Sequence, residues 1–155
     1  MVAEYFAELG PVDVWIEGYG NPYFLPSLST LWHYQAGYRF HPDTRERSPD
    51  WDDDWLVMAD EGGDPFIFSR ESAIVLHACH GEGVWAPVEM FGCLEEMATS
   101  LAIIGDIVQC AGPMLTDDDS RILPRHRQNA RDRIGRYLGS TERADAILLR
   151  LGWSA

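Results

Sequence analysis

The sequence predicts an α+β fold in which helices pack against a twisted, mostly antiparallel sheet and a C-terminal helical extension follows. Short runs of branched and aromatic residues between Trp55 and Val88 are separated by turn residues alone, which is typical of an antiparallel meander. Apolar residues then recur every three or four positions from Phe91 onward, which indicates an amphipathic helix. Because the strands come as a block and do not alternate with helices, the pattern favours α+β over a parallel α/β sheet.

The segment before the meander contains shorter elements. Gly10-Pro11 ends an N-terminal helix, and Gly37 ends a second helix that begins after Pro26. Pro49 and a run of acids then indicate a loop. The predicted elements are, in order, a helix over residues 2–9, a strand over 12–16, a helix over 27–36, a strand over 38–41 and an exposed polar loop over 42–54.

Turn residues mark the boundaries of the meander strands, and of the long helix that follows them in sequence, more clearly. Acidic and glycine-containing turns separate the strands, and Gly112-Pro113 ends the helix. Pro87 marks the end of its strand or a sheet edge. The strands are predicted over residues 55–59, 66–68, 73–79 and 84–88, and the helix over 91–112.

Two further helices are predicted in the tail. Pro124 fits the first position of a helix that Gly139 ends, and Ser140 caps a last helix that ends at Gly152. We therefore divide the chain into an α+β domain over residues 1–112 and a helical extension over residues 113–155 that packs on the same domain.

The chain is acidic, and its charge is unevenly distributed. It has 155 residues, of which 46% are hydrophobic, so a domain-sized core can form without disulfides. Residues 1–120 hold 22 acids and 4 Arg, a balance of −18, whereas residues 121–155 hold 8 Arg and 3 acids, a balance of +5. The first part would repel nucleic-acid backbones and anionic membranes. It would attract a basic protein, although acidity that merely aids solubility stays an open alternative.

We expect a cytoplasmic protein. The first ten residues contain Glu4 and Glu8 and no Lys or Arg, unlike a secretory leader. The longest apolar stretch carries Glu95, Glu96 and Asp106, so no run reaches about 18 uncharged apolar residues. Three cysteines without close paired spacing fit buried, reduced thiols.

The segment from Trp55 to Phe68 resembles the signature of the SMI1/KNR4 family, also called the SUKH superfamily. That signature is a strand, a Gly-Gly-Asp hairpin turn (here Gly62-Gly63-Asp64) and another strand. The chain departs from the family pattern at Ser69, where an Asp is frequent, and at Ala36-Gly37, where Asn-Gly is usual. Further segments in the family's order are Asn21 to Pro26 before a helix ending in glycine, a strand over 73–77, the turn His80-Gly81, Trp85 and a closing helix over 91–102, so the resemblance covers roughly residues 20–105.

The resemblance implies a non-catalytic domain that binds another protein, with no catalytic residue and no cofactor. Many bacterial members are thought to be immunity proteins that neutralise a toxin, often a nuclease, and fungal members act as regulatory modules. We therefore expect an immunity protein that covers a basic toxin through an acidic surface. The alternative is a regulatory or scaffolding module for an endogenous protein, and a toxin gene beside an immunity gene would separate the two.

The candidate partner-binding surface consists of acids around one aromatic residue. The acids would steer a basic protein, and the indole would fill a pocket in it. A solvated loop is the open alternative, and a Ca²⁺ site is disfavoured because the run lacks the spacing of a calcium loop. The candidate residues are Asp50, Trp51, Asp52, Asp53, Asp54, Asp60 and Glu61.

The other residue patterns in the sequence favour structural roles over ligand binding or catalysis. The run Glu61–Asp64 could cradle phosphate, but its acids favour a hairpin turn. His77, Cys79 and His80 could bind zinc in a small enzyme, but a closed site needs a fourth ligand. Cys79 or Cys93 could be a nucleophile, but acids near Cys93 oppose a thiolate. The tail arginines are expected to pair with the chain's own carboxylates. We therefore predict no enzyme activity, no metal and no cofactor.

Overall fold

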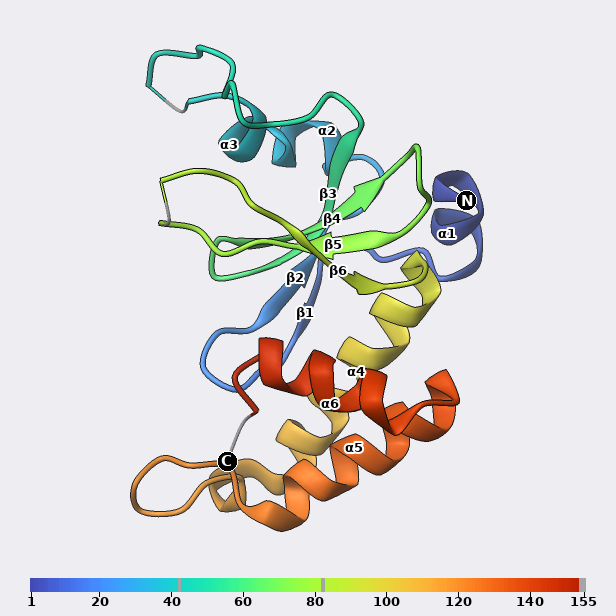
Figure 1. Cartoon of the computed structure of the whole chain (residues 1–155), viewed down its shortest axis with the longest axis vertical. Coiled ribbons are helices and arrows are strands. Elements are labelled where there is room, and N and C mark those ends of the chain that lie inside the picture. The colour runs from blue at the N-terminus through green and yellow to red at the C-terminus, as the bar shows by residue number, and fades with distance from the viewer. Residues whose placement is uncertain (42, 82, 154–155) are drawn as a thin grey trace. The chain divides into compact units, whose positions relative to one another are not determined.

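The computed structural model describes residues 1–41, 43–81 and 83–153 of the chain (Figure 1). The chain divides into two compact units: residues 1–15 and 23–97 form the first, and residues 16–22 and 98–155 form the second. The division predicted between residues 112 and 113 falls inside the second unit. The predicted class is confirmed, because the described residues form an α+β fold with a six-stranded antiparallel sheet and a C-terminal helical extension.

The sheet is a meander in which each strand neighbours the next strand along the chain (Figure 1). The sequence pattern does not predict β2, which is only three residues long. The last strand is displaced from its predicted place: β6 begins at Val88, because Pro87 has no N–H to donate to a ladder. The strands are β1 (Val14–Ile16), β2 (Tyr23–Leu25), β3 (Trp55–Glu61), β4 (Asp64–Ser69), β5 (Val75–His77) and β6 (Val88–Phe91).

The β3–β4 hairpin has the two-residue turn that its sequence predicts. Glu61 and Asp64 pair across it, and Gly62 and Gly63 lie between them with φ angles of 60° and 105°. A turn with positive φ at both central residues matches the twist of antiparallel strands, and glycine adopts it without steric cost. The glycines therefore serve the hairpin and do not form a phosphate loop before a helix.

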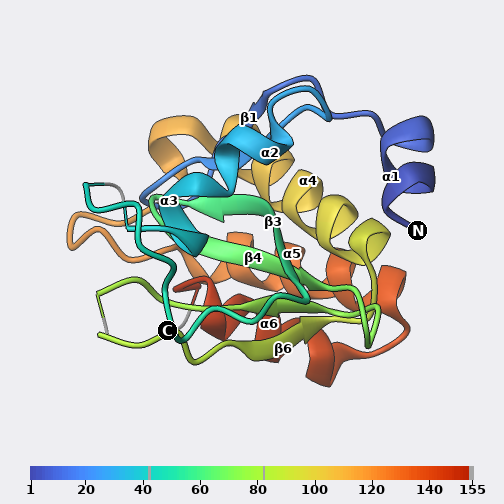
Figure 2. The same ribbon diagram turned by 90° about the horizontal axis from the view of Figure 1, so that it is seen from above.

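Two short helices stand where one helix and one strand are predicted. They are α2 (Leu31–Tyr34), which contacts β3, and α3 (Ala36–Arg39) (Figure 2). Gln35, between them, is buried, and its Nε2 donates to the carbonyl of Val57 at 2.9 Å while its Oε1 accepts from the N–H of Val57 at 2.8 Å. The strand predicted over 38–41 is wrong, because the chain continues as helix through Arg39.

The remaining helices lie close to their predicted positions in the sequence. α1 (Val2–Glu8) is the expected N-terminal helix, and α4 (Leu94–Ala111) is the expected amphipathic one. In the second unit, α5 (Pro124–Leu138) begins at its proline and ends before Gly139, and α6 (Thr141–Arg150) begins after Ser140, whose Oγ accepts from the N–H of Arg143 at 3.2 Å. A short 3-10 turn, Gly112–Met114, follows α4.

One helical stretch of the described residues, Leu94–Met114, is long and apolar enough to cross a membrane by length and composition alone. Core helices pass the same test. Met97, Leu101 and Ile104 on this stretch are completely buried, as expected of a core helix. The cytoplasmic location therefore stays a prediction.

Candidate functional site

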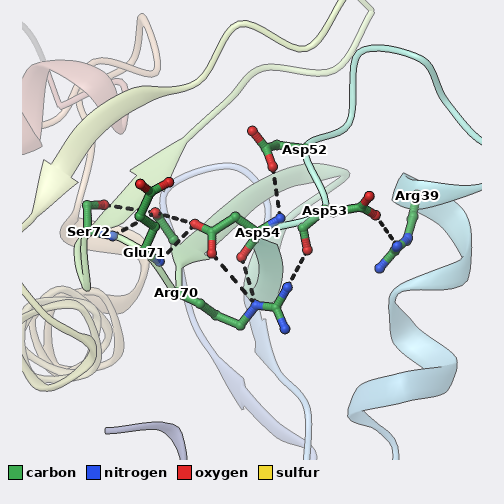
Figure 3. A network of polar contacts seen from close by, with 8 residues as sticks. Arg39, Asp52, Asp53, Asp54, Arg70, Glu71 and Ser72 are labelled. Atoms are coloured by element: carbon green, nitrogen blue, oxygen red, sulfur yellow. Dashed lines mark hydrogen bonds and ion pairs between the residues drawn. The ribbon is translucent and has the colours of Figure 1, made fainter.

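The acidic loop, residues Asp50–Asp54, is bonded to its own chain (Figure 3). Asp54 Oδ2 accepts hydrogen bonds from Ser69 Oγ at 2.6 Å and from the N–H of Glu71 at 3.0 Å. The Ser69 hydroxyl, the Glu71 amide and the nearby Arg70 guanidinium hold the pKa of Asp54 below its usual value. Asp54 thus ties the acidic loop to the turn that follows β4.

Two arginines neutralise part of the charge of the acidic loop. Arg39 of α3 donates to the Asp53 carboxylate, and Arg47 Nη2 lies 3.0 Å from the same oxygen (Figure 3 shows the Arg39 contact). Asp52 Oδ1 accepts from the N–H of Asp54 at 2.9 Å. Within the described residues, Asp50 and Asp52 form no ion pair and remain exposed. The acidic loop is therefore less able to attract a basic partner than its sequence suggests.

The prediction that the Trp51 indole fills a pocket in the partner is wrong. Its side chain is 1% exposed and lies in a core cluster with Val57, Ile67 and Ala78. The acids around it face water, but the indole turns inward, because burying an indole removes a large apolar surface from water. The sequence places Trp51 in a polar loop, and that context conceals its burial.

Next to this core cluster, the first unit has an open hollow of about 490 Å³, which we call the aromatic hollow. Its volume is that of a small-ligand or side-chain pocket. The ring of Tyr38 lies 5.9 Å from that of Trp85, 5.9 Å from that of Tyr34 and 6.0 Å from that of Trp51. The buried indole of Trp51 therefore supports the lining. The lining residues are His33, Tyr34, Gly37, Tyr38, Gly63, His80 and Trp85.

A carboxylate lies directly behind the lining of the aromatic hollow. Asp60 Oδ2 accepts from Tyr38 Oη at 2.5 Å and from the N–H of Gly63 at 3.1 Å. Burial and then hydrogen bonding to Asp60 raise the pKa values of Tyr34 and Tyr38, so both phenols stay protonated as donors. The structure thus brings Asp60, a candidate residue from the sequence, to this site.

A second carboxylate holds the rim of the aromatic hollow. Asp64 Oδ1 lies 2.6 Å from His80 Nδ1 and accepts from the N–H of His80 at 2.7 Å. The imidazole is exposed and sits over Gly63, where an added Cβ would lie 3.4 Å from the ring. None of the described lining residues is Arg or Lys. The site is therefore aromatic at its surface and negative behind it.

Glu61, the remaining candidate, lies at the end of β3 without a cation beside it among the described residues. Burial, and then the charges of Asp64 and Asp60, raise its pKa to about 8. The folded chain therefore holds a proton on Glu61 that the unfolded chain releases near its ordinary pKa of 4.5. This contribution to stability is complete below that value and is lost as the pH rises through about 8.

We expect Glu61→Gln to stabilise the protein increasingly as the pH rises from about 5 to about 9, because the amide cannot ionise beside Asp60 and Asp64. A gain of about 1 kcal/mol corresponds to a Tm increase of about 2–4 °C for a chain of this size. Thermal unfolding followed by circular dichroism at several pH values measures it. Glu89→Gln, the same substitution at an exposed site on β6, is the control. A Tm difference that does not change with pH would contradict the prediction.

The structure separates the residues of the zinc hypothesis. His77 is buried with its ring 4.8 Å from that of Phe66, whereas His80 is exposed and bonded to Asp64. In residues 1–41, 43–81 and 83–153, no group of three His, Cys, Asp or Glu side chains could hold a metal ion. Cys93 borders a different hollow of about 290 Å³ that also includes three glutamates, a setting that disfavours a thiolate.

Arginines of the tail pair with the chain's own acids, as expected. Arg131 Nε lies 2.7 Å from Asp145 Oδ1, and Arg133 Nη1 lies 2.6 Å from Asp106 Oδ2. The first pair joins α5 to α6, and the second joins α5 to α4. These arginines therefore have a structural role in the second unit.

Sequence reasoning misses the aromatic hollow itself. The spacing of Tyr34 and Tyr38, four residues apart, could have indicated a shared helical face. Trp85 and Gly63 reach the same place only through the meander, which no local spacing reveals.

Comparison with family models, with curated proteins and with solved structures finds no match for this chain.

Proposed function

We propose that this chain is a non-catalytic protein-binding domain of the SMI1/KNR4 type, an immunity protein that neutralises a basic toxin in the cytoplasm. The observation that supports it is the aromatic hollow: half-buried rings over carboxylates, without a competing Arg or Lys among the described lining residues. The balance of −18 over residues 1–120 supports a basic partner.

Binding would proceed in two stages. The negative surface would first increase the rate of encounter with a basic protein. Salt reduces this effect, because it screens the attraction between exposed charges beyond a Debye length of about 8–10 Å. The rings of Tyr38 and Trp85 would then contact the partner and exclude water. Aromatic residues of this kind are frequent hot spots of protein interfaces.

The test is binding to the protein encoded by the adjacent gene, measured by calorimetry at low and high salt, together with growth rescue of cells that express that protein. We expect a complex that weakens with salt, and rescue. Gly37→Leu is the blocking variant: Gly37 lines the aromatic hollow, and an added Cβ there has no atom within 4 Å, so a leucine can be introduced at the lining without displacing the chain. It should weaken binding by at least about tenfold, or about 1.4 kcal/mol.

Trp32→Ala is the matched control, since Trp32 lies on α2 and is 73% exposed but does not line the aromatic hollow. It should bind like the wild type. If the wild type neither binds the neighbouring protein nor rescues the cells, the immunity function is refuted. Binding without toxicity of the neighbour would instead favour the regulatory module for an endogenous protein.

A further inference from the structure

We propose that the aromatic hollow takes a single arginine side chain of the partner, with the guanidinium stacked on the rings of Tyr38 and Trp85. This inference rests on the proposed function and names the chemistry that the partner must present. It applies to the first unit, which contributes every described lining residue.

The lining favours a cation over a neutral or anionic group. The faces of aromatic rings carry partial negative charge and attract cations within about 6 Å of the ring centre. Asp60 and Asp64 lie one hydrogen bond behind Tyr38 and His80 and add a negative potential from that side. An anion would meet both carboxylates without a balancing Arg or Lys in the described lining.

The shape of the lining favours arginine over lysine. The rings of Tyr38 and Trp85 are inclined at 54° with centres 5.9 Å apart, so they form an angled pair of apolar walls. A planar guanidinium can stack on such a wall and still direct N–H groups to its edge, whereas a compact ammonium keeps its water more strongly. Asp64 lies behind His80, which holds one of its oxygens, and adds negative charge on the side of the rim toward which the guanidinium edge would point.

The lining is held in place before any ligand arrives. Tyr38 packs on the buried ring of Trp51 and donates to Asp60, which also accepts from the backbone N–H of Gly63. Trp85 packs on Trp51 as well, with ring centres 5.5 Å apart. Because these contacts fix the rings, little side-chain entropy remains to be lost on binding.

The experiment uses N-acetyl-arginine amide as the probe and N-acetyl-citrulline amide as its neutral isostere. Binding to the full chain is followed by backbone amide and indole N–H shifts in two-dimensional NMR. We expect saturable shifts at Gly63 and Trp85 with a Kd of the order of millimolar, and at least about tenfold weaker binding of citrulline. The lysine analogue should bind more weakly than arginine. Trp85→Ala should abolish the shifts at Gly63, and Trp32→Ala should retain them.

Three results would overturn the inference: equal binding of citrulline, shifts that centre on the acidic loop, or a neighbour-encoded partner that binds Trp85→Ala and Gly37→Leu as tightly as the wild type. The last result would leave the proposed function standing. If the arginine probe binds as expected while the neighbouring protein does not, the proposed function fails and the arginine site stands.

Discussion

Replacing Trp51 with alanine should lower the free energy of unfolding by about 3–5 kcal/mol, the cost of removing a large aromatic side chain from a core. Trp51 is 1% exposed and contacts the rings of Tyr38, Trp55 and Trp85 within about 6 Å. Urea unfolding followed by circular dichroism measures the change.

Two further variants make this test specific. Trp51→Phe should cost much less, because it keeps a ring and removes an indole N–H that has no hydrogen-bond partner among the described residues. Trp32→Ala, at an exposed tryptophan, should change stability by less than about 0.5 kcal/mol. A Trp51→Ala protein as stable as the wild type would show that the indole is a surface group after all.

Gly105→Ala should destabilise the second unit by about 1–3 kcal/mol through overpacking. A Cβ built on Gly105 of α4 would lie closer than 3.0 Å to Cγ2 of Ile16 and 3.5 Å from the carbonyl of Glu17. The clash should outweigh the gain in helix propensity, which is about 1 kcal/mol for glycine to alanine. The measurement is the free energy of unfolding in urea.

A double-mutant cycle identifies the cause. Ile16→Ala removes the obstructing methyl group, so the double variant should be more stable than the two separate losses predict, with a coupling of about 0.5–3 kcal/mol. Gly135→Ala is a milder comparison, since its Cβ would come no closer than 3.2 Å to Thr141. Strict additivity of Gly105→Ala and Ile16→Ala would contradict a direct contact.

The sequence predicts those parts of the fold that depend on neighbours along the chain. Gly62-Gly63 determines a hairpin, and Pro124, Gly139 and Ser140 mark helix boundaries through their own backbone preferences. These preferences act within a few residues, so they are visible in the pattern. The boundaries that differ, such as the start of β6, depend on pairing across the sheet.

The candidate site is less predictable because it depends on contacts between distant segments. Trp51 stands among four aspartates, yet its burial follows from Val57, Ile67 and Ala78, which the meander brings together. Asp53 and Asp54 look like free surface charge until Arg39 and Ser69 are placed beside them. Asp60 is the candidate that the structure brings to the aromatic hollow, through Tyr38, 22 residues away in sequence.

The succession of neighbouring strands also bears on how quickly the chain can fold. When every strand finds its partner in the segment just made, few distant loops must close, and low contact order is associated with rapid folding. The exception is the long connection from Leu25 to Trp55, whose closure carries the largest entropic cost in the sheet. During synthesis, the segment up to β2 must therefore wait for β3 to leave the ribosome, after which the hairpin partners can add one by one.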